Sequence, residues 1–178
     1  TQVNSSAEAT LRQTGKSALP KFYGGFTTSL STYGFDFSAA FAYQIGGYTM
    51  DSNYQSLMGA GRIGTNWHKD AFDRWTPQNK DSEVPRLQNA YQEASSTSTR
   101  WLTDASYISL RNLTVGYTFP KRIANRLSMQ SLRIFATGDN LWYLSRRKGL
   151  DVRQSFSGAT GFTYSALRTV SGGITVTF

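Results

Sequence analysis

The chain shows a repeated alternation of apolar and polar residues with a period of two. It is clearest over residues 35–46, where one parity is apolar throughout: Phe35, Phe37, Ala39, Phe41, Tyr43 and Ile45. Side chains of a β-strand point alternately to opposite faces, so this pattern predicts a strand with one apolar face; a helix would space apolar residues three and four apart. The segment is long enough to cross a hydrocarbon core, which takes about 9 to 11 tilted residues.

Weaker forms of the same alternation predict four more strands, at residues 22–31, 107–119, 132–144 and 168–178. Within 107–119 the apolar residues change parity near Arg111 and Asn112, which predicts a β-bulge or a strand boundary there. The connector 120–130 mixes basic and aliphatic residues and is expected to hold a short helical turn.

The connections between these strands alternate in length. Residues 1–21 form a polar loop leading into the first strand, residues 32–34 a short turn, and residues 47–105 and 145–167 long loops without a sustained period. Strands that pass up and down through an outer membrane have short periplasmic turns and longer outer loops. Five strands cannot close a barrel, since bacterial barrels have an even number of eight or more. The predicted fold is therefore all-β: the last antiparallel strands, about five, of a large transmembrane β-barrel, covering residues 22–178, with long extracellular loops.

Composition agrees with alternating strands and narrows the chemistry. Aromatic residues make up 14% of the chain, but the hydrophobic fraction is only 39% and the mean hydropathy is −0.42. No apolar run is long enough for a membrane helix, and no signal peptide is visible. The absence of cysteine excludes disulfides, thiolate metal sites and cysteine nucleophiles. The net charge of +8 comes from dispersed basic residues, so nucleic acid is not an expected partner.

The final strand ends in a recognisable arrangement. Val170, Ile174, Val176 and Phe178 share one face. The spacing Ser171-x-Gly173-x-x-Val176-x-Phe178 resembles the C-terminal signal of bacterial outer-membrane barrels, which implies recognition by the barrel-assembly machinery. An aromatic last residue also suits the aromatic girdle at a membrane interface.

Further runs resemble one family of such barrels. The most specific are Arg74-Trp75-Thr76-Pro77 and the segment Leu110-Arg111-Asn112-Leu113-Thr114-Val115-Gly116-Tyr117-Thr118-Phe119-Pro120. With Leu19 to Phe26, Pro85-Arg86, Thr103 to Tyr107, Gly138 to Leu141 and the terminal strand, they resemble the C-terminal end of SusC/RagA-type TonB-dependent transporters of Bacteroidetes outer membranes.

The chain departs from the family pattern in three places. Gly149-Leu150-Asp151-Val152-Arg153 stands where the family usually has Gly-x-Asp-Pro-Glu, Ile108-Ser109 where it often has Leu-Arg, and Ser165-Ala166 where a proline is common. These departures concern loop geometry more than membership of the family.

The resemblance implies an energised outer-membrane importer of glycans or oligopeptides. Its implied partners are the remaining barrel and plug, a SusD-type surface lipoprotein, the TonB complex through an N-terminal part outside this sequence, the barrel-assembly machinery and outer-membrane lipid. Passage involves no covalent chemistry and no cofactor. The alternative from the pattern alone is a soluble or surface-anchored β-sandwich that binds carbohydrate as an adhesin.

Candidate binding residues lie in the long loop and on the strands. Trp67, His68, Tyr91 and Trp101 are the substrate-binding candidates, because rigid aromatic rings stack on sugars and peptide side chains; Trp75 is expected to pack. Arg111, Arg133 and Arg168 are expected to line the lumen, since an arginine on the lipid face costs about 2 to 4 kcal/mol at mid-depth. His68 lies near Asp70 and Asp73, but no nucleophile elbow accompanies them, so an enzyme is not predicted. No metal site is predicted either, because the chain has one histidine and no calcium-loop motif.

Overall fold

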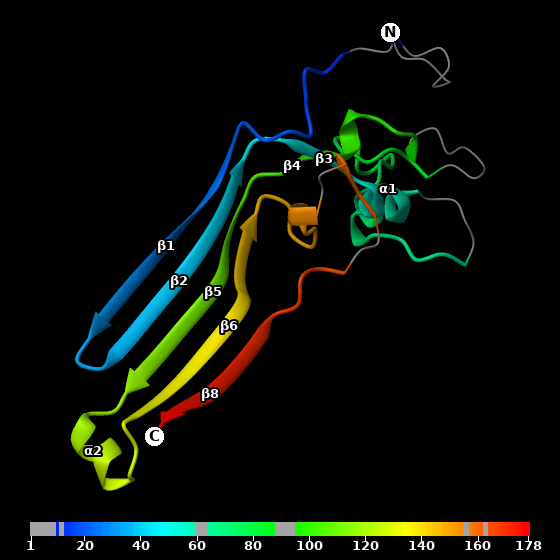
Figure 1. The fold of residues 1–178 in the computed structure, drawn as a ribbon. Coiled ribbons are helices and arrows are strands. Elements are labelled where there is room, and N and C mark those ends of the chain that lie inside the picture. Colours follow the sequence, from blue (N-terminus) through cyan, green and yellow to red (C-terminus); the bar gives the residue numbers. More distant parts are fainter. Residues whose placement is uncertain (1–9, 11–12, 60–63, 88–94, 155–156, 162–163) are drawn as a thin grey trace.

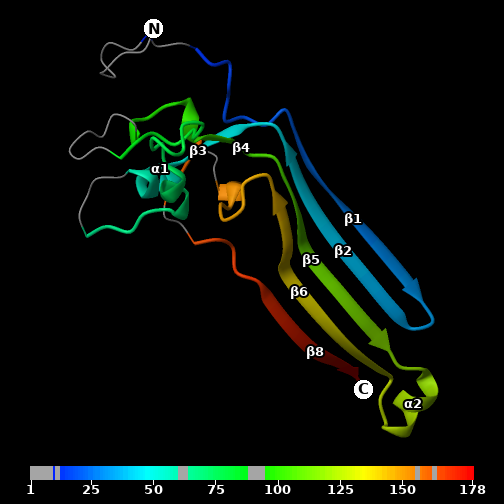
Figure 2. The same ribbon diagram turned by 180° about the vertical axis from the view of Figure 1, so that it is seen from behind.

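The dominant feature of the protein is an antiparallel sheet of five long strands. The computed structural model describes residues 10, 13–59, 64–87, 95–154, 157–161 and 164–178. The sheet has the order β1-β2-β5-β6-β8 (Figures 1 and 2). Its strands are β1 (Phe22–Thr32), β2 (Phe35–Ile45), β5 (Tyr107–Thr118), β6 (Ser131–Ser145) and β8 (Thr169–Thr177). The predicted all-β, antiparallel fold class is confirmed.

One face of this sheet is apolar and largely uncovered. The register places Phe26 opposite Phe41 and Phe35 opposite Tyr117, and the rings of Phe26 and Phe41 stack with centroids 4.8 Å apart. The exposed large residues of this face are Phe22, Phe26, Leu30, Phe35, Phe37, Ile45, Val115, Ile134, Trp142, Leu144, Val170 and Ile174. A β-sandwich would cover such a face with a second sheet, and none does so among the described residues. The apolar face therefore needs another apolar medium, which a lipid bilayer supplies.

The opposite face carries a polar network. Asn112 donates to Asp139 (2.8 Å) and to the hydroxyl of Thr137 (3.2 Å), and Thr114 lies 3.1 Å from that hydroxyl. The register places Asn112 opposite Asp139 and Thr114 opposite Thr137, so these contacts run across neighbouring strands. A polar inner face is what the water-filled interior of an outer-membrane barrel requires.

The change of parity in β5 is a β-bulge. Ala40 pairs with Asn112 and Phe41 with Leu110, which leaves Arg111 as the extra residue of β5. On the other side Asn112 pairs with Asp139 and Leu110 with Trp142, so β6 carries its own irregularity at the same level. The bulge predicted near Arg111 is confirmed. The bulge places Ile108 and Leu110 on the same apolar face as Leu113 and Val115.

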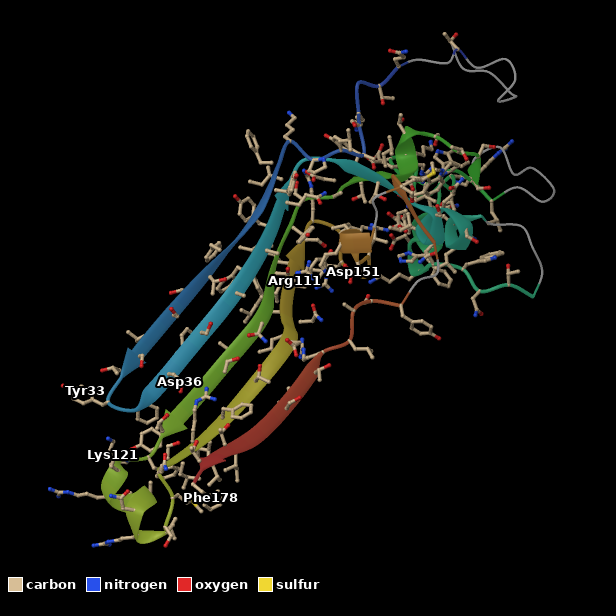
Figure 3. The ribbon with its side chains drawn as sticks, in the orientation of Figure 1. Tyr33, Asp36, Arg111, Lys121, Asp151 and Phe178 are labelled. Carbon is tan, nitrogen blue, oxygen red and sulfur yellow. The ribbon has the colours of Figure 1, made fainter. Side chains whose placement is uncertain are left out.

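The two ends of the sheet differ in their connections. At one end lie the short turn at Tyr33, α2 (Lys121–Arg126) and Phe178 (Figure 3). The helical turn predicted in the connector 120–130 is thus confirmed. At the other end the two long connections gather (Figure 1). None of the described helices has the length and hydropathy needed to cross a membrane.

The described residues of the long connection 47–105 form a folded unit, termed the outer unit. It contains β3 (Tyr48–Asp51), α1 (Ser52–Met58), η2 (Lys69–Asp73), η4 (Thr99–Trp101) and β4 (Leu102–Asp104). β7 (Ala159–Thr160) from the second connection, which also holds η5 (Val152–Gln154), completes a three-stranded sheet in the order β4-β3-β7. These elements are too short to repeat a period, which is why the sequence showed only an irregular loop. A small core of Met58, Ala71 and Trp101 holds the unit together, with Met50, Tyr54 and Val84 packed around it.

Candidate functional site

An ion pair joins the two long connections, 47–105 and 145–167, at the end of the sheet where they gather. Arg147 of the second connection donates from Nε to Oδ2 of Asp51 at 3.1 Å, and its guanidinium lies 4.1 Å from the ring centroid of Tyr54. The other oxygen of Asp51 caps α1 by accepting the N–H of Tyr54 at 3.0 Å. The Tyr54 hydroxyl in turn donates to Asp70 at 2.9 Å. Burial, and then the hydrogen bond to Asp70, raise the pKa of Tyr54, so its hydroxyl stays a donor at neutral pH.

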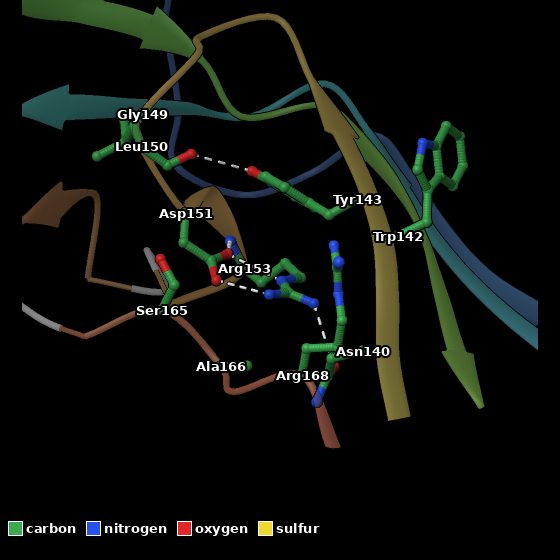
Figure 4. Close-up of a pocket in the computed structure, with 10 residues that line it drawn as sticks. All are labelled: Asn140, Trp142, Tyr143, Gly149, Leu150, Asp151, Arg153, Ser165, Ala166 and Arg168. Carbon is green, nitrogen blue, oxygen red and sulfur yellow. Dashed lines mark hydrogen bonds and ion pairs between the residues drawn. The ribbon is translucent and has the colours of Figure 1, made fainter. Parts of the chain in front are cut away.

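A pocket of about 510 Å³ opens where β6, the second connection and the start of β8 meet (Figure 4). Asn140 and Tyr143 line it from β6. The register places Tyr143 opposite Ser109, on the polar face of the sheet. The other lining residues are Trp142, Gly149, Leu150, Asp151, Arg153, Ser165, Ala166 and Arg168. The pocket therefore has one wall on strand β6, and its charged residues, Asp151, Arg153 and Arg168, lie outside the strands.

Tyr143 fixes the loop wall of this pocket. Its hydroxyl donates to the carbonyl of Leu150 at 3.2 Å and accepts the N–H of Val152 at 3.1 Å. Leu150 and Val152 are buried in a small cluster with Ala105, against the rings of Tyr107 and Tyr143. Because both hydrogen bonds and the packing act on one short segment, the loop has a defined place over the sheet.

An internal ion pair occupies the same wall. Nε and Nη2 of Arg153 donate to the two carboxylate oxygens of Asp151 at 2.8 and 2.7 Å, and Nη1 donates to Asn140 at 3.3 Å. Burial acts to raise the pKa of Asp151, but the hydrogen bonds and charge of Arg153 outweigh it and hold that pKa below its usual range. The guanidinium also lies 4.7 Å from the ring centroid of Tyr143. Asp151 is therefore charged and already paired.

Arg168, just before β8, also lines the pocket (Figure 4). Within the part of the chain that the structure describes, it forms no ion pair or hydrogen bond. Arg133, by contrast, is paired: Nε and Nη2 donate to the oxygens of Asp36 at 3.0 and 2.5 Å. This pair crosses over Gly116 on the polar face. Arg111 is exposed at the bulge.

The predicted aromatic binding residues that the structure describes differ in exposure. Trp67 is 42% exposed, and its indole N–H donates to Thr65 at 3.2 Å. His68 begins η2: its Nδ1 accepts the N–H of Asp70 at 3.2 Å. Since Nδ1 is an acceptor there, it does not donate to the Asp70 carboxylate 3.3 Å away. His68 thus has a capping role in the structure, and Trp67 retains an accessible ring.

Trp101, a predicted substrate-binding residue, is buried in the structure. Trp101 is 2% exposed, its ring meets Tyr54 edge-on, and its N–H donates to the carbonyl of Ser96 at 2.9 Å. The ring is covered because it is the largest member of the core of the outer unit. Trp75, expected to pack, is 38% exposed. Tyr91 lies outside the described residues.

The residues of the proposed assembly signal divide between the two faces. Ser171 lies opposite Thr137 and Gly173 opposite Phe135, while Val176 lies opposite Leu132. A Cβ on Gly173 would lie 2.5 Å from the ring of Phe135, so any larger residue here would displace this ring from its place over β8. Phe178 is exposed at the end of the chain.

Sequence reasoning did not identify the residues that build the pocket wall. Asn140, Tyr143, Asp151 and Arg153 were not among the predicted site residues. One signal was present, because Val152-Arg153 departs from the family pattern, and Arg153 is the partner of Asp151. No group of three or more His, Asp or Glu side chains suited to a metal ion occurs within the described ranges.

Comparisons with known proteins agree with this architecture. The chain is 31% identical over 137 residues, 77% of its length, to TonB-dependent receptor P3 of Formosa agariphila, and 26% identical over 91% of its length to TonB-dependent receptor P26 of that organism. It spans about 13% and 17% of those receptors. The chain belongs to the SusC/RagA-type TonB-dependent receptors. No family model matches it.

This TonB-dependent receptor chain also resembles solved structures of a peptide transporter. It aligns with the structure of the RagAB peptide transporter over 92% of its length, with 27% identity and a TM-score of 0.77, and covers 18% of that chain. The RagAB peptide importer in its open-open and closed-closed states gives the same TM-score at 28% identity. These relatives are receptors and importers, which confirms the prediction of a protein that is not an enzyme.

Proposed function

We propose that this chain supplies five barrel strands and two outer connections to a TonB-dependent importer of the bacterial outer membrane. One observation carries the proposal: the sheet has one exposed apolar face and one polar face, in a chain that aligns with the RagAB peptide transporter over 92% of its own length. The apolar face suits lipid and the polar face suits an aqueous lumen. The outer unit and the pocket lie at the end of the sheet where cargo would arrive.

The cargo in this proposal is an oligopeptide, with a glycan as the second candidate. The solved structures that resemble the chain are named as peptide transporters or importers, which favours peptide. The exposed ring of Trp67 in the outer unit suits either cargo, because an aromatic face stacks on sugars and on peptide side chains. A SusD-type surface lipoprotein, a plug and the TonB complex complete the proposed machine.

Co-purification from native outer membranes tests the proposal. An affinity tag beside Gly64, an exposed residue with no atom within 4 Å of its Cβ position, leaves the strands and Phe178 unchanged. After extraction in mild detergent, mass spectrometry should find a large barrel-and-plug polypeptide, a surface lipoprotein and bound cargo. Recovery of the chain alone in the soluble fraction would instead favour the β-sandwich adhesin.

Growth assays separate the two kinds of cargo. A deletion strain should grow more slowly than wild type when oligopeptides are the limiting nutrient and equally well on free amino acids. A defect on oligosaccharides with normal growth on oligopeptides would make glycan the cargo. Normal growth of the deletion strain on both would contradict import as the function.

A further inference from the structure

The pocket beside β6 and β8 carries one positive charge that nothing in the described structure neutralises. Of the charged groups that line it, Asp151 and Arg153 are committed to each other through two hydrogen bonds. Arg168 has no partner among the described residues. A guanidinium with free N–H groups in a concave site is a strong donor to an anion.

The remaining polar groups of the pocket narrow what it binds. Both ends of the Asn140 amide are engaged, since its oxygen accepts from Arg153 and its nitrogen donates to the carbonyl of Leu167 at 3.2 Å. Tyr143 is saturated by Leu150 and Val152. Ser165 is exposed, and within the described chain its hydroxyl has no hydrogen bond. The charged group without a partner in the described chain is therefore the Arg168 guanidinium, which suits a planar oxyanion.

The size and support of the pocket suit one end of a longer cargo molecule. Its volume of about 510 Å³ lies within the usual range for ligand sites, about 300 to 1,000 Å³. The loop wall of the pocket is held by Tyr143 and by the Asp151–Arg153 pair, so little ordering of that wall is left for binding.

We propose that this pocket is a cargo subsite in which Arg168 binds a carboxylate group. The subsite rests on the proposed import function and adds a preference for anionic cargo. The carboxylate has two possible sources: the α-carboxylate at the end of a peptide, or a uronate of an acidic glycan. Both present the same planar pair of oxygens to the guanidinium.

The test uses the complete importer, purified from outer membranes as wild type, Arg168→Gln and Lys148→Gln. Lys148 is an exposed residue of the same outer connection and does not line the pocket, so its variant removes the same charge without altering the subsite. Each protein is offered an N-acetylated oligopeptide library without Asp or Glu, half with a free α-carboxylate and half amidated. A second arm offers galacturonate oligosaccharides against the matching galactose oligosaccharides. Retained molecules are identified by mass spectrometry.

We expect wild type and Lys148→Gln to retain the carboxylate form of one cargo type by about tenfold over its neutral form, as one charged hydrogen-bonded contact provides. Arg168→Gln should retain both forms equally. The arm that shows this loss identifies the source of the carboxylate. Equal retention of both forms by wild type, or an unchanged preference in Arg168→Gln, would overturn the subsite while leaving import intact. Retention of nothing in either arm would count against the proposed function itself.

Discussion

At the scale of single residues, the ion pair between Arg133 and Asp36 on the polar face passes over Gly116. The Arg133 side chain reaches Asp36 by crossing β5 over Gly116, and a Cβ on that glycine would lie 2.5 Å from Nη2 of Arg133 and from Oδ1 of Asp36. A larger residue here would therefore displace the paired side chains from their present positions.

Replacing Gly116 with alanine is expected to lower the temperature at which the barrel unfolds. The added methyl group displaces the paired side chains, although alanine normally reduces the entropy of the unfolded chain relative to glycine. Gly172→Ala is the matched control: its Cβ would have only an ordinary contact, 3.6 Å from the carbonyl oxygen of Phe135. Heat-dependent mobility on denaturing gels measures the change. Equal unfolding temperatures for the two variants would show that the ion pair does not depend on Gly116.

Asp151 makes the docking of the second connection depend on pH. Its pKa in the folded protein lies below the ordinary value of about 3.9. The pairing therefore stabilises the docked loop at any pH above the unfolded-state pKa, and this contribution is lost as the pH falls through the folded-state pKa. A nitroxide probe at the exposed Ser157 should become mobile only below about pH 4.

Asp151→Asn should show the mobile spectrum already at pH 7, because the neutral amide no longer balances the charge of Arg153. Exposed Asp81 provides the control, and Asp81→Asn should keep the wild-type profile. An immobile probe in Asp151→Asn at neutral pH would mean that Tyr143 and the buried Leu150 and Val152 hold the loop without the ion pair.

At the scale of elements, the outer unit behaves as a small domain built on the sheet. Trp101 is the centre of its core, and β7 from the second connection pairs with β3 through Met50 opposite Ala159. The hydroxyl of Thr160 donates to the carbonyl of Met50 at 3.2 Å, and Arg147 binds Asp51. The two connections are thus one structure, and a change in either is transmitted to the other through these contacts.

Trp101→Ala is expected to destabilise the outer unit by about 3 to 5 kcal/mol, the usual cost of removing a large buried aromatic side chain. The strands should remain assembled, since their ladder does not include this residue. Limited trypsin digestion of intact cells should cut within 47–105 faster than in wild type. Trp67→Ala, at an exposed position, should be cut at the wild-type rate. Equal cutting of both variants would show that Trp101 does not organise the unit.

At the scale of the whole molecule, the five strands form an incomplete structure. Strands β1 and β8 each have a neighbour on one side only, and the apolar face is uncovered within the described residues. Both features are resolved by closure into a barrel that lies in lipid, because a closed barrel has no free edge. The likeness to barrel importers follows from the same geometry.

Assembly of that barrel is expected to depend on Phe178, which is 79% exposed on the apolar side of β8. Phe178→Ala should lower the amount of folded importer in the outer membrane severalfold, while Phe178→Tyr, which keeps an interfacial ring, should be close to wild type. Quantitative blots of membrane fractions measure the difference. Normal levels of Phe178→Ala would remove the terminal aromatic residue from the assembly signal.

The alternation of apolar and polar residues was enough to predict the strands, their apolar face and the bulge in β5. Period two along residues 35–46 is a local property, so it specified a strand and its apolar face directly. The parity change at Arg111 is local as well, and it located the bulge. The family resemblance came from short motifs and pointed to the same barrel.

Tertiary structure alone decided where the chemistry lies. Asp51 meets Arg147 from a segment far away in the chain, and no pattern within either segment encodes that meeting. Trp67 and Trp101 look alike in sequence, yet one ring is exposed and the other is buried. Burial depends on which other short elements pack around a residue, and that is settled only when the outer unit folds on the sheet.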